Sequence, residues 1–490
     1  MFQFYDELDN TGFFDSWDNW KTYIPFYDAY ELWANGSDYI LSEGYERSKE
    51  TGVGILEPLP FGGVLRQIPL VSWAVSFVPR IYVFSGTKSN LEAVAEYGEH
   101  VKDSKAREPH ERVRQATEAT TIVNLLGDAA KQEKQKIRAN LSSKRALECA
   151  KELGATVSEI WDDQLSLQDN VTYIGATLIG RSFLGIQEFP REYVPLIREA
   201  NDLIADGNAT SNEFAQMKAK MLAMSDVILA KEAKKILEDK KGYVLTQFQF
   251  DEKESSEAAV AKLISSHGGA GFLVESNLSF ILMVAMAYIS SSPSIYERLY
   301  KEIQSVGELS TQSFKDLEYL DCIYRETIRF ASPTAVVPRV ASVTSTMNVE
   351  NKNKEKSTCT IYPNSYLFFA IRSTHHDPEL WPNPHLFDPL RFMPVVKERK
   401  MHFMGENYFP FSGGKRACPA GTTFVESAFK GFIFELFKNH TLGIEKQLEH
   451  IPSFAVHPRW KEDYFVQLNT NSTLENDCES LSEHSGPCKG

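Results

Sequence analysis

The stretch FPFSGGKRACPAG, from Phe409 to Gly421, surrounds one cysteine with glycines, aromatic side chains and two cations. Its spacing reads Phe-x-x-Gly-x-Arg-x-Cys-x-Ala, with the specified positions at Phe411, Gly414, Arg416, Cys418 and Ala420. A cysteine in a hydrophobic core needs no such surroundings. A thiolate that binds iron needs backbone N–H groups turned toward its sulfur, and a glycine-rich turn permits that close approach. A helix that begins just after the cysteine would also direct its positive end at the thiolate.

Two further segments belong with this stretch. YRETIRF, from Tyr324 to Phe330, places Glu326 and Arg329 three residues apart on one face of a helix, a spacing that also arises by chance. HHDPELWPNPHLFDPLRF is rich in proline and aromatic residues and carries Arg391, which can reach back to Glu326. We expect a buried network of Glu326, Arg329 and Arg391 that holds this loop beneath a cofactor. His375 and His376, which precede Asp377, are expected to make structural hydrogen bonds.

In this order and separation the three segments resemble the haem-thiolate monooxygenases of the cytochrome P-450 superfamily. The resemblance implies haem b (iron protoporphyrin IX) with Cys418 as its axial thiolate and metal ligand, and with Phe411, Gly414 and Arg416 in the cofactor-binding loop. NLLGDAAKQEKQKIRANL resembles the helix whose arginine, here Arg138, meets a haem propionate. Lys134 stands where the family often has Trp or His, and it could pair with the same group. VVPRVA resembles the strand that supplies a further propionate partner, Arg339.

The segment HGGAGFLVES resembles part of the long helix that crosses the distal face of the haem, here about residues 258 to 291. In one register Leu273 and Val274 occupy the acid and alcohol positions of the family's proton relay, and no relay exists. In the other, Glu275 and Ser276 occupy them, and Leu273 replaces the glycine that makes room for dioxygen. Gly271 marks a place where backbone comes close to a neighbour. Glu275 and Ser276 could instead solvate the outer face of the helix.

The spacing of apolar residues along the chain, with short β-rich segments near its start and after residue 333, predicts a mainly helical fold with a small β domain. Hydrophobic residues make up 42% of the 490 residues and aromatic residues 12%, which is enough for a large core. We expect a single haem-thiolate catalytic domain over residues 1–470, a small β region from 1–105 and 333–370, and a polar tail at 471–490. The haem would lie between the long distal helix and the proximal cysteine loop. The longest apolar run, Phe280 to Ile289, is too short to span a bilayer and indicates a buried helix.

Charge and cysteine usage narrow the partners and the compartment. A net charge of -14 argues against nucleic-acid binding. Six cysteines are too few for a disulfide framework, and the N-terminus carries no signal-peptide pattern, so we expect a soluble, cytoplasmic protein without a transmembrane anchor. A basic cluster would receive an acidic electron donor, namely a ferredoxin, a flavodoxin or a flavoprotein reductase. Its members are Lys131, Lys134, Lys136, Arg138, Lys144, Lys415 and Arg416.

The resemblance implies a monooxygenase that inserts one oxygen atom of O2 into a hydrophobic small molecule, by hydroxylation or epoxidation. The register with Leu273 and Val274 leaves open a relay-less isomerase or dehydratase, or a peroxygenase that acts on peroxides. A haem-binding protein without catalysis is the third reading. The substrate cannot be read from the sequence.

Overall fold

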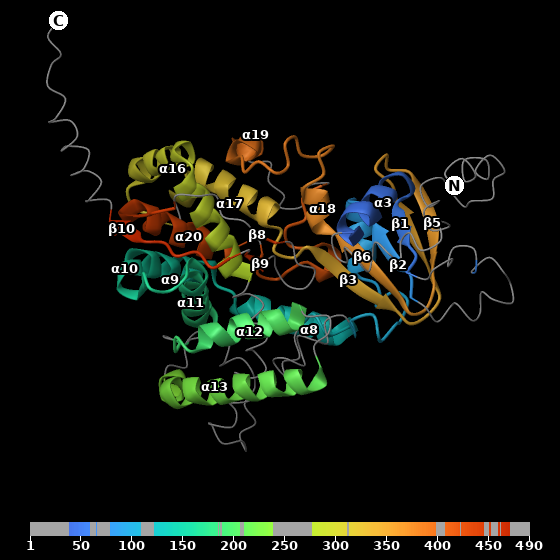
Figure 1. Ribbon diagram of the computed structural model, residues 1–490, viewed down its shortest axis with the longest axis horizontal. Helices are drawn as coiled ribbons and strands as arrows, with labels where there is room; N and C mark the ends of the chain where they lie inside the picture. Colours follow the sequence, from blue (N-terminus) through green and yellow to red (C-terminus); the bar gives the residue numbers. More distant parts are fainter. Residues whose placement is uncertain are drawn as a thin grey trace, which may run out of the picture.

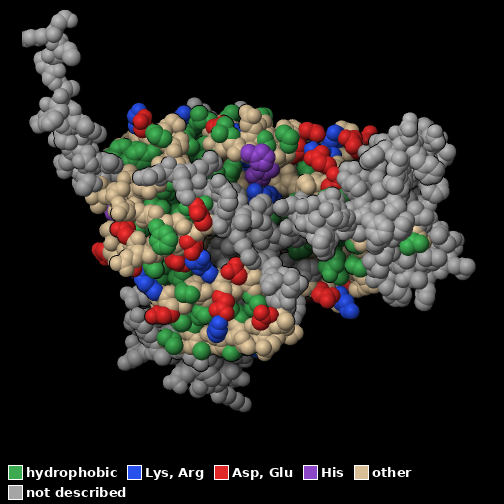
Figure 2. Space-filling view, in the orientation of Figure 1, with side chains coloured by type: hydrophobic (Ala, Val, Ile, Leu, Met, Phe, Trp, Pro, Cys, Tyr) green, Lys and Arg blue, Asp and Glu red, His purple; other side chains and the backbone are tan. Residues whose placement is uncertain are grey.

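The computed structural model describes residues 39–58, 65, 79–108, 122–184, 186, 189–205, 210–238, 277–310, 313–397, 407–421, 423–444, 450–451, 459–460 and 462–470. A small sheet stands at one end of the molecule and the helices form the other (Figure 1). Acidic, basic and hydrophobic side chains are interspersed over the described part of the face drawn in Figure 2.

The main sheet joins strands that lie far apart in the sequence. Its order is β1 (Val53–Leu56), β2 (Ile81–Phe84), β6 (Ser365–Ala370) and β3 (Val336–Ala341). β2 runs parallel to β6, whereas β3 pairs with β6 antiparallel and sets Arg339 opposite Leu367. The antiparallel hairpin of β4 (Ser345–Glu350) and β5 (Lys356–Ile361) adjoins it. These strands are rich in β-branched and aromatic residues, which suit a half-buried pleated surface.

Two helices flank the sheet, α3 (Tyr45–Thr51) and α6 (Lys88–Ala95). The remaining helices build the larger part of the molecule (Figure 1). The longer ones are α8 (Gly127–Asn140), α9 (Ser143–Ala155), α11 (Leu167–Ile179), α12 (Tyr193–Ala205), α13 (Ser211–Glu238), α16 (Pro293–Val306), α17 (Glu318–Ala331) and α20 (Phe424–Asn439). The shorter ones are α10 (Val157–Ile160), α18 (Ile371–His375), α19 (Met393–Lys397), η2 (Ile40–Gly44), η4 (Gly180–Leu184), η5 (Ser313–Lys315), η6 (Pro389–Phe392) and η7 (Gly414–Arg416). Two small strand pairs complete the fold, β7 (His440–Leu442) with β10 (Leu468–Thr470) and β8 (His450–Ile451) with β9 (Arg459–Trp460).

The core lies between α9, α17, α20 and the apolar helix Asn277–Ser291. Small residues let α9 and α20 approach closely: a Cβ at Gly431 would lie 2.9 Å from the Ala150 Cβ. Leu282 and Val284 in the apolar helix are fully buried, as the sequence predicts for this run. No single helix in the described ranges is long and apolar enough to cross a membrane. The helices Asn277–Ser291 and Pro293–Val306 reach that length and hydrophobicity only when taken together, and they are bent by 104° relative to each other.

Candidate active site

The cysteine loop is closed by backbone geometry that requires glycine. Gly414 has φ +59°, the left-handed region in which a side chain is strained, and it opens the turn η7. A Cβ there would also lie 2.5 Å from Glu96 Oε1. The Cys418 N–H donates to the Phe411 carbonyl oxygen at 2.9 Å, which closes the loop and fixes the backbone of the cysteine.

The Cys418 thiol is enclosed by protein yet retains accessible surface. Burial is the largest influence and raises the pKa of Cys418. The N–H groups of Ala420 and Gly421 and the positive charges of Lys134 and Arg138 act in the opposite direction. These groups favour the thiolate, so the predicted N–H donors to the sulfur are present. An accessible sulfur with such donors suits a metal-bound thiolate better than a core cysteine.

Phe411 and Gly421 pack against each other beside the cysteine. A Cβ at Gly421 would overlap the Phe411 ring, so only glycine fits there. The helix α20 begins at Phe424, six residues after Cys418, and its N-terminus follows the loop directly. This is the helix start that the sequence predicts behind the cysteine, and its dipole favours negative charge at that end.

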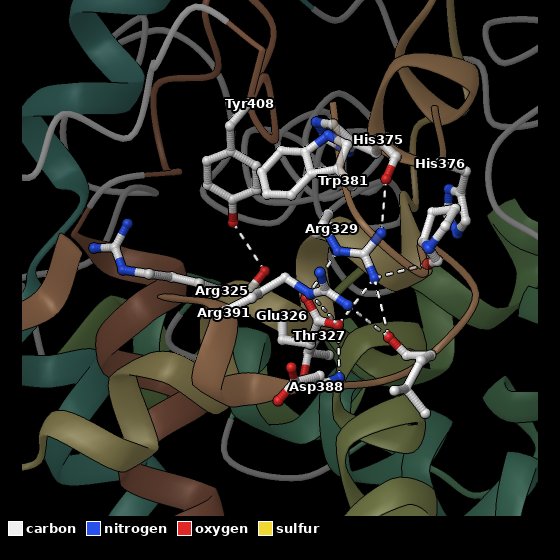
Figure 3. Close-up of polar contacts among 12 residues, drawn as sticks. Arg325, Glu326, Thr327, Arg329, His375, His376, Trp381, Asp388, Arg391 and Tyr408 are labelled. Carbon is white, nitrogen blue, oxygen red and sulfur yellow. Dashed lines mark hydrogen bonds and ion pairs between the residues drawn. The ribbon is translucent and has the colours of Figure 1, made fainter. Parts of the chain in front are cut away.

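The predicted network of Glu326, Arg329 and Arg391 is present and buried. Glu326 and Arg329 are each 0% exposed. The Arg329 Nε donates to Glu326 Oε2 at 2.8 Å and its Nη2 to Oε1 at 2.9 Å, which is a bidentate pair. The Arg391 Nε donates to Glu326 Oε1 at 3.1 Å. Figure 3 shows these side chains converging on one carboxylate.

The same network holds the proline-rich loop through its backbone. The Asp388 N–H donates to Glu326 Oε1 at 2.8 Å. Arg329 donates from Nη1 to the His375 carbonyl oxygen at 2.7 Å (Figure 3). It also donates from Nη2 to the Pro384 carbonyl oxygen at 2.9 Å. Every one of these bonds involves a charged group in a buried setting, where such bonds are strong and their loss is costly.

Three arginines meet at the cysteine loop: Arg107 and Arg339 are buried, Arg416 is half-buried, and Arg107 was not predicted. Arg107 and Arg339 both donate to the Ala95 carbonyl oxygen, at 3.0 and 2.7 Å. The Arg416 Nη1 lies 3.2 Å from Glu99 Oε1, and the Arg107 Nη2 lies 3.8 Å from the same oxygen. We call Arg107, Arg339 and Arg416 the arginine cluster. Among the described residues Glu99 lies within ion-pair distance of this cluster, and the charge of Glu96 also acts on Arg416.

The electrostatics of the arginine cluster call for an anion. Burial, followed by the charge of Arg416, lowers the pKa of Arg107 to about 9. Burial and the charge of Arg107 hold the pKa of Arg339 well below its usual range. The buried Nε of Arg107 has no hydrogen-bond partner among the described residues. Buried cations in excess of carboxylates are costly unless an anionic group pairs with them. A cofactor with two carboxylates, such as haem, fits this cluster.

Lys134 and Arg138 lie on α8 on the side of the cysteine loop. The Lys134 Nζ donates to the Lys415 carbonyl oxygen at 2.8 Å. Burial, followed by the charges of Arg138 and Arg416, lowers the pKa of Lys134, while the nearby Cys418 raises it. The Arg138 side chain is exposed. The structure therefore brings both residues near the thiol, as predicted, and it attaches Lys134 directly to the loop.

The predicted distal residues Gly271, Glu275 and Ser276, and the rival pair Leu273 and Val274, lie outside the described residues. Sequence reasoning missed Arg107 and Glu99. Both belong to the segment between α6 and the next described helix, where no spacing pattern marks them. Only their convergence with Arg339 from β3 and Arg416 from η7 reveals them.

A family model described as Cytochrome P450 matches residues 194–458, which is 265 of the 490 residues. The chain belongs to the cytochrome P450 family. Cytochrome P450 3A40 of Oryzias latipes is 30% identical over 169 residues, which cover 34% of this chain and 31% of that protein. Thromboxane-A synthase of Mus musculus is 30% identical over 151 residues, 30% of this chain and 25% of that protein. The matches thus span about a third of the length of these curated relatives or less.

The fold of this P450 is also that of a solved relative. A zebra fish cytochrome P450, in a structure with abiraterone, aligns over 80% of this chain and 94% of its own with a TM-score of 0.57 and 15% identity. That likeness shows the mainly α fold. Members of the family hold haem through a cysteine thiolate. The Cys418 loop and the arginine cluster of this P450 fit such a group, so its cofactor is haem with a cysteine axial ligand.

Proposed function

We propose that this P450 is a monooxygenase that inserts one oxygen atom of O2 into a hydrophobic small molecule, with electrons from a separate redox partner. The observation that carries the proposal is the Cys418 loop. Cys418 is exposed, and the N–H groups of Ala420 and Gly421 and the charges of Lys134 and Arg138 act on its thiol. When bound, a thiolate-ligated haem supplies the electron density that favours O–O cleavage.

Different residues of the chain would hold different parts of the haem. Cys418 would be the axial ligand of the haem, and the N–H groups of Ala420 and Gly421 would favour its anionic form against the burial that raises its pKa. Arg339 and Arg416 would bind the propionates, and Arg107 would join them through its Nε, which has no hydrogen-bond partner among the described residues. Glu326, Arg329 and Arg391 hold the loop that precedes the cysteine segment. Phe411, packed on Gly421, restricts water beside the sulfur.

The electron donor would dock on a basic surface beside the thiol. The exposed lysines of this surface are Lys131, Lys144 and Lys415. The carbonyl oxygen of Lys415 accepts a hydrogen bond from the Lys134 ammonium. The Lys144 Nζ lies 3.8 Å from Glu148 Oε1, so this carboxylate offsets part of the positive charge of the surface. A positive face close to the iron ligand raises the encounter rate with an acidic ferredoxin, flavodoxin or flavoprotein reductase.

A relay-less reaction is the second candidate, because one matching relative is a thromboxane-A synthase. In this alternative the protein rearranges or dehydrates a peroxide, or uses hydrogen peroxide directly. Without a proton relay, activation of O2 would be slow while reactions of substrates that already contain an O–O bond would proceed.

One experiment separates the two candidates. The purified holoprotein is given a panel of hydrophobic substrates with a generic ferredoxin–reductase pair and NADPH, and in parallel with hydrogen peroxide or organic peroxides alone. The monooxygenase proposal expects an oxygenated product that depends on the reductase and takes its added oxygen from ¹⁸O2. Product that forms only from peroxides, without electrons, contradicts the proposal and supports the alternative.

A further inference from the structure

We propose that His375 is a positioning residue for the cysteine loop: as a neutral imidazole it accepts the Phe409 N–H and thereby sets the backbone that carries Cys418. The proposal rests on the assignment of Cys418 as the haem ligand. The hydrogen bond between the His375 ring and the Phe409 N–H belongs neither to the Glu326 network nor to the cysteine pattern.

Both nitrogens of the His375 ring are engaged in a fully buried setting. The Phe409 N–H donates to Nε2 at 2.9 Å, so Nε2 is the acceptor. Nδ1 then carries the proton and donates to Ser332 Oγ at 3.0 Å. The Ser332 hydroxyl in turn donates to the Arg329 carbonyl oxygen at 2.7 Å. The ring is 0% exposed, and this chain of bonds fixes its tautomer.

His375 connects the ion network to the loop through two different parts of one residue. Its carbonyl oxygen is held by Arg329, and its ring holds Phe409. Two residues beyond Phe409, the Phe411 carbonyl oxygen accepts the Cys418 N–H at 2.9 Å. The Phe409 ring also packs edge-on against Phe369 of β6, which fixes the loop to the sheet. Figure 3 shows His375, Trp381 and Tyr408 grouped beside Arg329.

The acceptor role depends on the ring staying neutral. Burial, followed by the charges of Arg329 and Arg372, lowers the pKa of His375 to about 3. The ring is packed between Trp381 and Tyr408, whose hydroxyl donates to the Arg325 carbonyl oxygen at 3.0 Å. Glutamine can place a carbonyl oxygen close to the position of Nε2, whereas asparagine is too short and leucine offers no acceptor.

The test compares His375→Gln, His375→Asn and His375→Leu in the holoprotein, with His376→Gln as the matched control. His376 stands next in the chain, and among the described residues its Nδ1 bonds locally, to the Arg372 carbonyl oxygen at 3.0 Å. Hydrogen exchange by mass spectrometry follows the peptide 408–418, with α17 and α20 as internal references. The ferrous carbon monoxide spectrum is recorded in increasing urea beside the far-UV circular dichroism.

We expect exchange in peptide 408–418 to be at least tenfold faster in His375→Asn and His375→Leu, with α17 and α20 unchanged. The thiolate band should be lost at a urea concentration where the helical signal is intact. His375→Gln should restore most of the protection, and His376→Gln should match the wild type. Wild-type exchange in His375→Asn, or an equal increase in all three segments, overturns the proposal. If His375→Leu fails to fold, the Gln and Asn pair decides. A wild type without the thiolate band would contradict the proposed function, while the exchange comparison would still test the role of His375.

Discussion

Arg329 binds the main chain of His375: its guanidinium Nη1 donates to the His375 carbonyl oxygen at 2.7 Å. The imidazole of His375 in turn accepts a hydrogen bond from the Phe409 N–H. A buried ion network on α17 is thereby connected to the loop that carries Cys418, although the two lie far apart in the sequence. The strength of this connection depends on Glu326, which neutralises Arg329 with a bidentate contact.

Removing the Glu326 carboxylate should be severe. Glu326→Ala leaves the Arg329 charge buried without its partner and releases Arg391, at a cost on the order of 3–5 kcal/mol. We expect a correspondingly lower free energy of unfolding in urea and a haem-to-protein ratio far below that of the wild type. Glu318→Ala, at an exposed position on the same helix, is the control and should change neither quantity appreciably. A normal holoprotein from Glu326→Ala would show that the network does not support the site.

Arg107 should affect the haem-free and haem-bound proteins in opposite directions. Burial, followed by the charge of Arg416, lowers the pKa of Arg107 to about 9, so the charged Arg107 is unfavourable in the haem-free protein. Arg107→Leu should therefore stabilise the haem-free protein against urea. The same change removes a partner of the propionates, so haem should transfer to an excess of apomyoglobin several-fold faster. Equal destabilisation of both forms would mean that Arg107 is a packing residue and that the cluster is not an anion site.

The basic surface should show itself in the salt dependence of electron transfer. Lys131→Glu combined with Lys415→Glu reverses two exposed charges of the proposed basic surface, where the Lys415 Nζ also lies 3.5 Å from Glu96 Oε2. We expect a slower bimolecular rate of reduction by an acidic ferredoxin at low salt, with a difference from the wild type that fades as ionic strength rises. The control is Lys220→Glu on α13, where the lysine pairs with Glu199. A rate unchanged by the double reversal would place the docking surface elsewhere.

Stability should fall as the pH is lowered from neutral because of the buried His375 and the half-buried His376. The pKa of His375 is lowered to about 3, and that of His376 is also held well below its usual 6.5. The unfolded chain therefore binds protons that the native state does not, so the stability present above pH 6.5 is lost as the pH falls toward 3. Each histidine contributes a slope of about 1.4 kcal/mol per pH unit in this window. Urea unfolding of His375→Gln should show a slope smaller by about that amount. An identical slope would indicate that His375 is protonated in the native state.

The sequence predicts the proximal half of the site well because the requirements there are local. Gly414 must adopt positive φ, and Cys418 must follow it at a fixed distance, so the pattern itself encodes the geometry. Glu326 and Arg329 share one helical turn, and Arg391 reaches them from a loop of defined composition. The arginine cluster could not be predicted in full, because Arg107 and Glu99 meet Arg339 and Arg416 only once β3, η7 and the segment after α6 are assembled. His375 was expected to make structural hydrogen bonds, which is confirmed, but its link to Phe409 depends on tertiary packing.

The most direct measurement is the difference spectrum of the reduced protein with and without carbon monoxide, for the wild type, Cys418→Ala and Cys418→His. The family is named for a Soret band at about 450 nm. If Cys418 is the thiolate ligand, the wild type should show this band and both variants should lack it. Persistence of that band in Cys418→Ala would contradict the account, because another residue would then be the ligand of the iron.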